Sequence, residues 1–143
     1  MTKYIVFVVC LMILTWSILG WPEVSGDTCV ITRVVDGDTV KARCNGQDTT
    51  IRLTLIDSYE SKRNSRSYRQ AYEQHLTIEE VVNRGKQATV IAKKELEGKT
   101  VILKHNSNNS VDRYGRDLGE LYLNGTSVNL KFLDQHPDLY LKY

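Results

Sequence analysis

The sequence has little net charge and few of the side chains that bind transition metals. Its 143 residues carry a formal net charge of only +2, which argues against a protein that binds nucleic acid through a strong overall basic field. Any anion binding must therefore come from local arginines. The three histidines, His75, His105 and His136, lie in polar stretches without the spacing of zinc ligands, so we interpret them as surface residues.

The composition is that of a globular protein. Charged residues make up 25% of the chain and hydrophobic residues 41%, which excludes a disordered or fibrous protein. The length fits a single domain with a modest core.

Residues 1–26 have the layout of a secretory signal peptide. Lys3 supplies the positive start, and the apolar run from Tyr4 to Leu19 is short for a membrane span. We therefore expect cleavage near Gly26, a secreted or periplasmic protein, and one folded domain over residues 27–143. The alternative is an uncleaved membrane anchor, because two tryptophans near this run could lie at a membrane interface.

Two of the three cysteines belong to the predicted folded domain. Cys29 and Cys44 lie almost symmetrically about Asp36-Gly37, a dipeptide typical of a tight hairpin turn. Across such a hairpin the two thiols would face each other, close enough for a disulfide in an oxidising compartment. The alternative is a pair of unbonded small core residues.

An alternating pattern predicts a strand over residues 49–56. Ile51, Leu53 and Leu55 would share the face that enters a core, while Arg52 would point from the other face into a cleft. Arg52 is therefore a candidate site residue on local grounds alone.

Periodicity also places the helices. Thr77-Ile78-Glu79-Glu80 matches a capping box for a short helix that Gly85 could interrupt, and apolar residues at helical spacing predict the main helix over 88–96. A further short helix is expected over 129–135. The polar segment 61–74 has no strand or helix period, so we expect a mobile loop there.

The remaining signals are those of short strands. An Asn-Gly turn predicts a hairpin late in the chain, and a separate strand follows the main helix. The predicted strands cover residues 29–35, 39–44, 49–56, 100–104, 118–123 and 126–128. These elements predict an α+β, mainly β domain built as a small Greek-key barrel with flanking helices.

Acidic and arginine side chains lie near the ends of these strands. Asp38, Asp57 and Glu60 form a group of carboxylates that suits a hard divalent cation. Arg52 adds a fixed cation for an anionic substrate. A second arginine, Arg116, follows later in the chain.

Three separated blocks carry a family resemblance. Asp36-Gly37-Asp38-Thr39, the stretch from Arg52 to Glu60, and Asp112-Arg113-Tyr114-Gly115-Arg116 occur in the order and at the spacing of the staphylococcal nuclease (thermonuclease) family. The chain resembles this family over roughly residues 29–132. The resemblance implies an OB-fold barrel. It also implies a Ca²⁺-dependent nuclease that cuts DNA and RNA as a monomer, without a stable protein partner, leaving 3′-phosphate ends.

The same resemblance implies a role for each matching residue. Asp38, Asp57 and the backbone carbonyl of Ser58 would bind one Ca²⁺ ion. Glu60 would act as general base on the attacking water.

The resemblance also assigns residues to the substrate. Arg52 and Arg116 would bind the phosphate and stabilise its growing charge, and Tyr114 would line the substrate pocket.

The sequence departs from the family pattern around the base. Tyr59 stands where the family usually has proline, which predicts a less rigid loop and a lower rate. Ser58 replaces a usual threonine, a mild change because the expected ligand is a backbone carbonyl. Segment 61–84 is longer than in the family pattern. The basic residues of its polar part, 61–74, form either a solvated face or a rim that guides the phosphodiester backbone.

Other interpretations of the same residues remain open. Asp36 and Asp38 could serve only as turn formers, and Arg116 could pair with Asp112 or Asp117 at the surface. The alternative function is a non-catalytic OB-fold module that binds single-stranded nucleic acid or a protein partner.

Overall fold

The computed structural model describes residues 20, 23–106 and 110–143. Nearly all of the predicted signal peptide therefore lies outside the described residues. None of the helices in the described part of the chain combines the length and the apolar character needed to cross a membrane.

The described chain contains eight strands and three helices. The strands are β1 (Asp27–Asp36), β2 (Thr39–Cys44), β3 (Gln47–Leu53), β4 (Ile56–Ser58), β5 (Thr100–His105), β6 (Asp117–Leu123), β7 (Thr126–Ser127) and β8 (Tyr140–Lys142). The helices are α2 (Ser65–Gln74), α3 (Ile78–Leu96) and α4 (Val128–Gln135).

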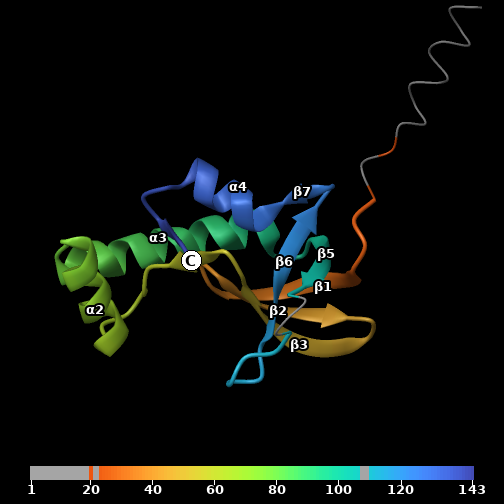
Figure 1. Cartoon of the computed structure of the whole chain (residues 1–143), viewed down its shortest axis with the longest axis horizontal. Coiled ribbons are helices and arrows are strands. Elements are labelled where there is room, and N and C mark those ends of the chain that lie inside the picture. The colour runs from red at the N-terminus through yellow and green to blue at the C-terminus, as the bar shows by residue number, and fades with distance from the viewer. Residues whose placement is uncertain (1–19, 21–22, 107–109) are drawn as a thin grey trace, which may run out of the picture.

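Five of the strands close into a barrel (Figure 1). β1, β2 and β3 form an antiparallel meander, β5 pairs with β1, and β6 pairs with β5. The barrel closes where β6 lies parallel to β3, with Arg52 opposite Leu118. This mainly β, α+β arrangement confirms the predicted OB-fold barrel with flanking helices.

The core fills the barrel and the space between it and two helices. Alternate strand residues such as Ile31, Ile51 and Leu121 are fully buried, as expected for strands with one face in a core. α3 covers the barrel with a stripe of small and apolar residues. On α4, the ring of Phe132 stacks on that of Tyr140, with the ring centres 5.2 Å apart.

Cys29 and Cys44 are joined by a disulfide across the first hairpin. They are Cα partners in the β1–β2 ladder, with their Cα atoms 4.1 Å apart. The bond closes a loop with a sequence separation of 15, and such a cross-link stabilises a fold mainly by restricting the unfolded chain.

The third strand ends earlier than its alternation predicts. β3 stops at Leu53, and Leu55 adopts a left-handed conformation with φ 69° before β4 begins. Leu55 is 42% exposed instead of entering the core, so its predicted place was wrong. Bulky residues rarely adopt this conformation because the side chain is crowded there.

The predicted mobile loop over 61–74 was also wrong, because most of it is the helix α2. Asn64 caps this helix, and its side chain accepts a hydrogen bond from the backbone of Ser67 in a reciprocal capping box. The buried residues of α2 are Ser67 and Gln70 rather than apolar ones. The helix therefore lacks the apolar period on which the sequence prediction relied.

Gly85 does not interrupt the next helix. The capping box at Thr77 begins α3 as predicted, and the helix continues through Gly85 to Leu96. A Cβ atom at Gly85 would overlap the carbonyl carbon and oxygen of Glu60. Glycine is therefore required here for close approach of the helix to the loop after β4.

We expect Gly85→Ala to destabilise the protein. Glycine-to-alanine changes inside helices usually stabilise by up to about 1 kcal/mol, but here the methyl group would displace the Glu60 backbone, an overpacking effect of about 1–3 kcal/mol. Urea unfolding measures the change. Val90→Ala, at an exposed position of the same helix, is the control and should be close to neutral. A stabilised Gly85→Ala protein would contradict this packing.

Candidate active site

The turn between β1 and β2 fixes Asp38. Asp36 accepts a hydrogen bond from the Asp38 backbone (3.1 Å), so Asp36 acts as a turn former. The carboxylate of Asp38 is buried and accepts hydrogen bonds from the Thr39 hydroxyl (3.0 Å) and the Ser58 backbone N–H (2.7 Å). Asp38 is therefore held in place by its own hairpin and by β4.

The guanidinium group of Arg52 connects the end of β3 with β4. Its Nη1 atom donates to the carbonyl oxygens of Leu53 and Ile56, the latter at 3.0 Å. Its Nη2 atom lies 2.8 Å from Asp57 Oδ1 and 3.2 Å from Asp38 Oδ2. With only 11% of its side chain exposed, Arg52 fixes the kink around Leu55 and binds both carboxylates.

A third arginine, which the sequence analysis did not single out, continues this arrangement. Arg66 on α2 donates from Nη2 to Asp57 Oδ1, and its Nη1 atom lies 3.2 Å from Glu60 Oε1. Its side chain is 39% exposed, so it lies at the edge of the site. Nothing in the polar segment around Arg66 distinguishes it from the neighbouring basic residues.

We call Asp38, Arg52, Asp57, Arg66 and Glu60 the ion-pair chain. In this order each side chain contacts the next, with carboxylates and guanidinium groups alternating. Three carboxylates and two guanidinium groups leave one excess negative charge, which favours an additional cation. Burial raises the pKa of the Asp38 carboxyl, and the charge of Arg52 opposes this shift only in part.

The donor set fits a hard divalent cation. Asp38 Oδ2 and Asp57 Oδ1 both reach the same nitrogen atom of Arg52, so these two oxygens converge on a position where a positive charge already lies. Within the part of the chain that the structure describes, no three acidic, histidine or cysteine side chains are grouped to hold a metal ion. The remaining ligands would be backbone and water oxygens, which such cations accept.

The loop that carries Glu60 is held by a buried glutamine. Gln70 donates to the Ser58 carbonyl oxygen (3.2 Å) and accepts from the Glu60 backbone N–H (2.9 Å). One of the two lone pairs of the Ser58 carbonyl is thus used within the protein. Tyr59 is buried between these residues, and the guanidinium of Arg84 lies 5.5 Å from its ring centre. Tyr59 stands where the family usually has proline, and the hydrogen bonds of Gln70 and the contact with Arg84 restrain the loop at this position.

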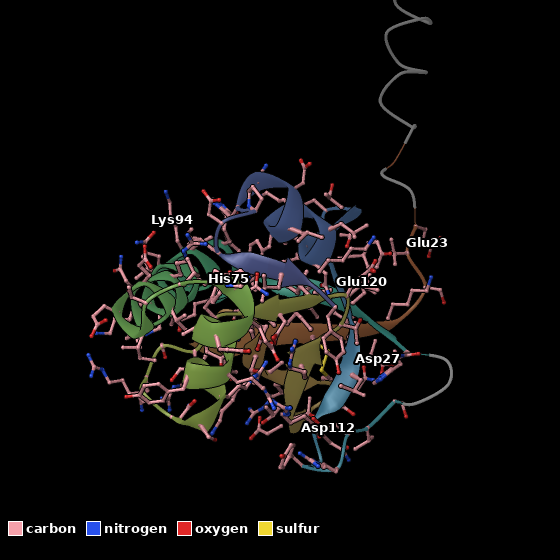
Figure 2. All side chains as sticks on the ribbon, turned by 60° about the vertical axis from the view of Figure 1, so that its left-hand side comes forward. Glu23, Asp27, His75, Lys94, Asp112 and Glu120 are labelled. Carbon is pink, nitrogen blue, oxygen red and sulfur yellow. A yellow bond between two sulfur atoms is a disulfide. The ribbon has the colours of Figure 1, made fainter. Side chains whose placement is uncertain are left out.

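Arg116 and Tyr114 form a separate group on the turn before β6. Asp112 accepts hydrogen bonds from the backbone N–H groups of Tyr114 and Arg116, both at 2.9 Å, and from Arg116 Nε at 2.7 Å. Desolvation raises the pKa of the Asp112 carboxyl, but the hydrogen bonds from Arg116 and Tyr114 together hold this pKa below its usual value. Figure 2 labels Asp112 at the lower edge of the molecule.

The structure thus joins Asp38, Arg52, Asp57 and Glu60 but pairs Arg116 with Asp112, as one of the alternatives anticipated. The Arg116 side chain is 30% exposed, and its guanidinium lies 5.4 Å from the centre of the exposed Tyr114 ring.

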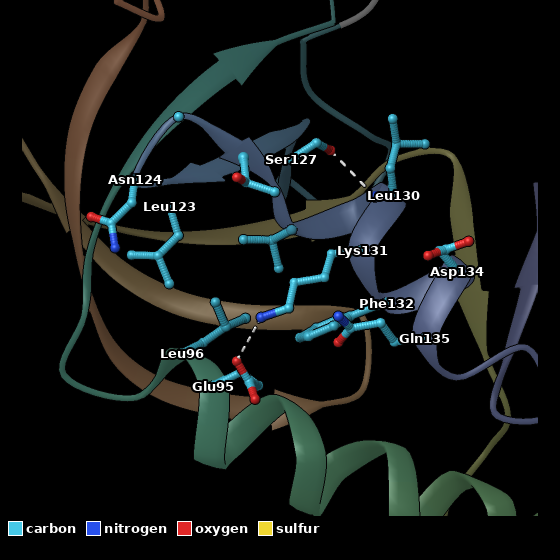
Figure 3. Close-up of a pocket in the computed structure, with 13 residues that line it drawn as sticks. Glu95, Leu96, Leu123, Asn124, Ser127, Leu130, Lys131, Phe132, Asp134 and Gln135 are labelled. Atoms are coloured by element: carbon cyan, nitrogen blue, oxygen red, sulfur yellow. Dashed lines mark hydrogen bonds and ion pairs between the residues drawn. The ribbon is translucent and has the colours of Figure 1, made fainter. Parts of the chain in front are cut away.

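A hollow elsewhere on the surface does not belong to this site. It lies between α4, the β6–β7 hairpin and the end of α3 (Figure 3). None of the residues of the ion-pair chain lines it. Lys131 and Glu95 form an ion pair across it at 3.1 Å beside Leu96 and Phe132, so its contacts join α4 to α3.

Comparison with known proteins identifies the family. The family model described as staphylococcal nuclease homologue matches residues 50–135. The chain is 30% identical to a thermonuclease of Staphylococcus intermedius over 76% of its length, 33% identical to the SPbeta prophage-derived endonuclease YokF of Bacillus subtilis over 73%, and 31% identical to endonuclease YncB of the same organism over 73%. It covers 56%, 31% and 44% of these relatives, respectively. The chain therefore belongs to the staphylococcal nuclease homologue family.

Proposed function

We propose that this protein is a Ca²⁺-dependent nuclease that hydrolyses phosphodiester bonds of DNA and RNA and leaves 3′-phosphate products. Membership of a nuclease family supports the reaction class. The observation that carries the proposal is the ion-pair chain, which gathers three carboxylates and two guanidinium groups at one edge of a rigid barrel. Hydrolysis of a phosphodiester needs a proton acceptor, positive charge and an ordered water at one place.

Asp38, Asp57 and the Ser58 carbonyl are the proposed Ca²⁺ ligands. The two carboxylates contact the same nitrogen atom of Arg52, so they lie side by side, and the excess negative charge of the group favours an additional cation next to them. When bound, the ion would supply Lewis-acid stabilisation of negative charge on the phosphate. The protein keeps these ligands in place through the Asp38 turn and Arg52.

Glu60 is the proposed general base. Its carboxylate lies at the exposed end of the ion-pair chain, 24% exposed, where water can reach it. It accepts one hydrogen bond from Asn64 and contacts Arg66, so its orientation is fixed before substrate arrives. A fixed base avoids the cost of ordering the side chain during the reaction.

Arg52 and Arg116 are the proposed phosphate-binding arginines, with Tyr114 lining the substrate pocket. Arg116 is the more accessible of the two and would exchange Asp112 for a phosphate oxygen. Leu118, two residues after Arg116, is the Cα partner of Arg52 in the β3–β6 ladder. This register places both arginines on neighbouring chain segments of the same barrel edge, which supports action on one substrate.

We also propose that the protein is secreted or periplasmic, with residues 1–26 removed as a signal peptide. The disulfide between Cys29 and Cys44 supports an oxidising compartment. N-terminal sequencing of protein recovered outside the cytoplasm should begin near residue 27. A chain that retains Met1 in the membrane fraction would support the anchored alternative instead.

We expect Glu60→Gln and Arg116→Lys each to lower turnover on DNA by at least about 100-fold, the loss typical when a general base or a charge-stabilising donor is removed. Steady-state cleavage of DNA in Ca²⁺ buffer measures it.

Glu79→Gln and Arg43→Lys are the matched controls, because each alters an exposed ion pair outside the ion-pair chain. Both should retain activity. A loss of less than about tenfold for Glu60→Gln would mean that the base is misassigned.

A further inference from the structure

Both carboxylate oxygens of Glu60 are held by side chains from one short segment. Asn64 Nδ2 donates to Glu60 Oε2 at 2.8 Å, and Arg66 Nη1 lies 3.2 Å from Glu60 Oε1. Asn64 also caps α2, and Arg66 lies in the first turn of that helix. The N-terminal end of α2 therefore contacts the carboxylate of Glu60 directly.

The same helix holds the backbone on both sides of Tyr59. The buried Gln70 side chain donates to the Ser58 carbonyl oxygen and accepts from the Glu60 N–H. An amide that makes both bonds fixes the separation and orientation of these two peptide groups. Side chain and backbone of Glu60 are thus restrained by one element.

The buried face of α2 contacts the rest of the protein through hydrogen bonds rather than through apolar side chains. Its buried residues are Ser67 and Gln70, and buried polar groups are costly unless each is paired. Gln70 is paired with the loop that bears Glu60, and Ser67 completes the cap with Asn64. A helix that served only to cover the core would usually bury apolar residues such as leucine or alanine.

We propose that α2 is a positioning element for the general base and that Arg66 is its principal positioning residue. Arg66 orients the Glu60 carboxylate, Asn64 holds the second oxygen, and Gln70 fixes the backbone. The inference rests on the proposed function, because it assigns α2 a role only through Glu60. It gives a role in the reaction to the helix found where a mobile loop was predicted.

The test is a double-mutant cycle between Arg66→Gln and Glu60→Gln, with single-turnover cleavage of a DNA oligonucleotide in Ca²⁺ buffer. We expect Arg66→Gln alone to lower the rate at saturating substrate by about 10- to 50-fold and to change KM by less than about threefold. In the Glu60→Gln background the same change should cost less than about threefold, because the side chain it orients is no longer a base.

Two further variants separate positioning from stability. Asn64→Ser keeps an oxygen for the helix cap but removes the amide donor to Glu60, and it should lower the rate by about 3- to 10-fold with an unchanged melting temperature. Arg66→Lys keeps the charge and should recover part of the loss. Arg43→Gln removes an exposed arginine–carboxylate pair and should change neither the rate nor KM.

The outcomes are distinct. An Arg66→Gln loss that persists in full in the Glu60→Gln background would mean that Arg66 acts through Asp57 or through the substrate rather than through Glu60, and it would overturn the proposal. Losses that follow only the melting temperature would do the same. If Glu60→Gln itself remains fully active, the proposed base is wrong whatever Arg66 does, so failure of the function and failure of the inference are told apart.

Discussion

The guanidinium group of Arg52 joins the end of β3 to β4 and to two carboxylates. It binds carbonyl oxygens on both sides of the kink at Leu55 and also contacts Asp57 and Asp38. A single buried cation thus determines where β3 ends, where β4 begins and how two carboxylates face each other. Breaking such a buried pair leaves an uncompensated charge, which is strongly destabilising. The local fold and the candidate site therefore share one interaction.

The barrel supplies the rigidity that this cation needs. β3 is held by β2 on one side and by β6 on the other, so Arg52 projects from a strand without a free edge. Asn129 of α4 donates to the carbonyl oxygen of Thr54 at 2.7 Å, which adds a second restraint on the kink. Catalytic groups on such a framework need little reordering when substrate binds.

Much of this architecture follows from local sequence signals. The two Asn-Gly turns contain the left-handed residues Asn45, Gly46, Asn124 and Gly125 that tight hairpins require. The apolar period of α3 correctly predicted a helix that packs on the barrel. The symmetry of Cys29 and Cys44 about the first turn correctly predicted their disulfide. The clustering of Asp38, Arg52, Asp57 and Glu60 followed from two short blocks of sequence, whereas the third block forms the separate group of Arg116 and Asp112.

Other features had no local signal. Leu55 adopts a conformation that sequence rules reserve for glycine or asparagine, because contacts of Arg52 and Asn129 impose it. α2 buries the polar residues Ser67 and Gln70, and Gln70 hydrogen-bonds the loop just before the helix, so its sequence had the pattern of a polar loop. Arg66 became recognisable only when that helix placed it beside Asp57 and Glu60.

The proposed function depends on Asp38 and Asp57 binding a hard divalent cation near Glu60. The most direct measurement is DNA digestion by the purified protein, first with Ca²⁺, then with a chelator, and then with Mg²⁺ in place of Ca²⁺. We expect cleavage with Ca²⁺, none with the chelator and poor recovery with Mg²⁺, because Mg²⁺ demands a tighter octahedral site. Undiminished cleavage in the chelator, or equal cleavage with Mg²⁺, would contradict it.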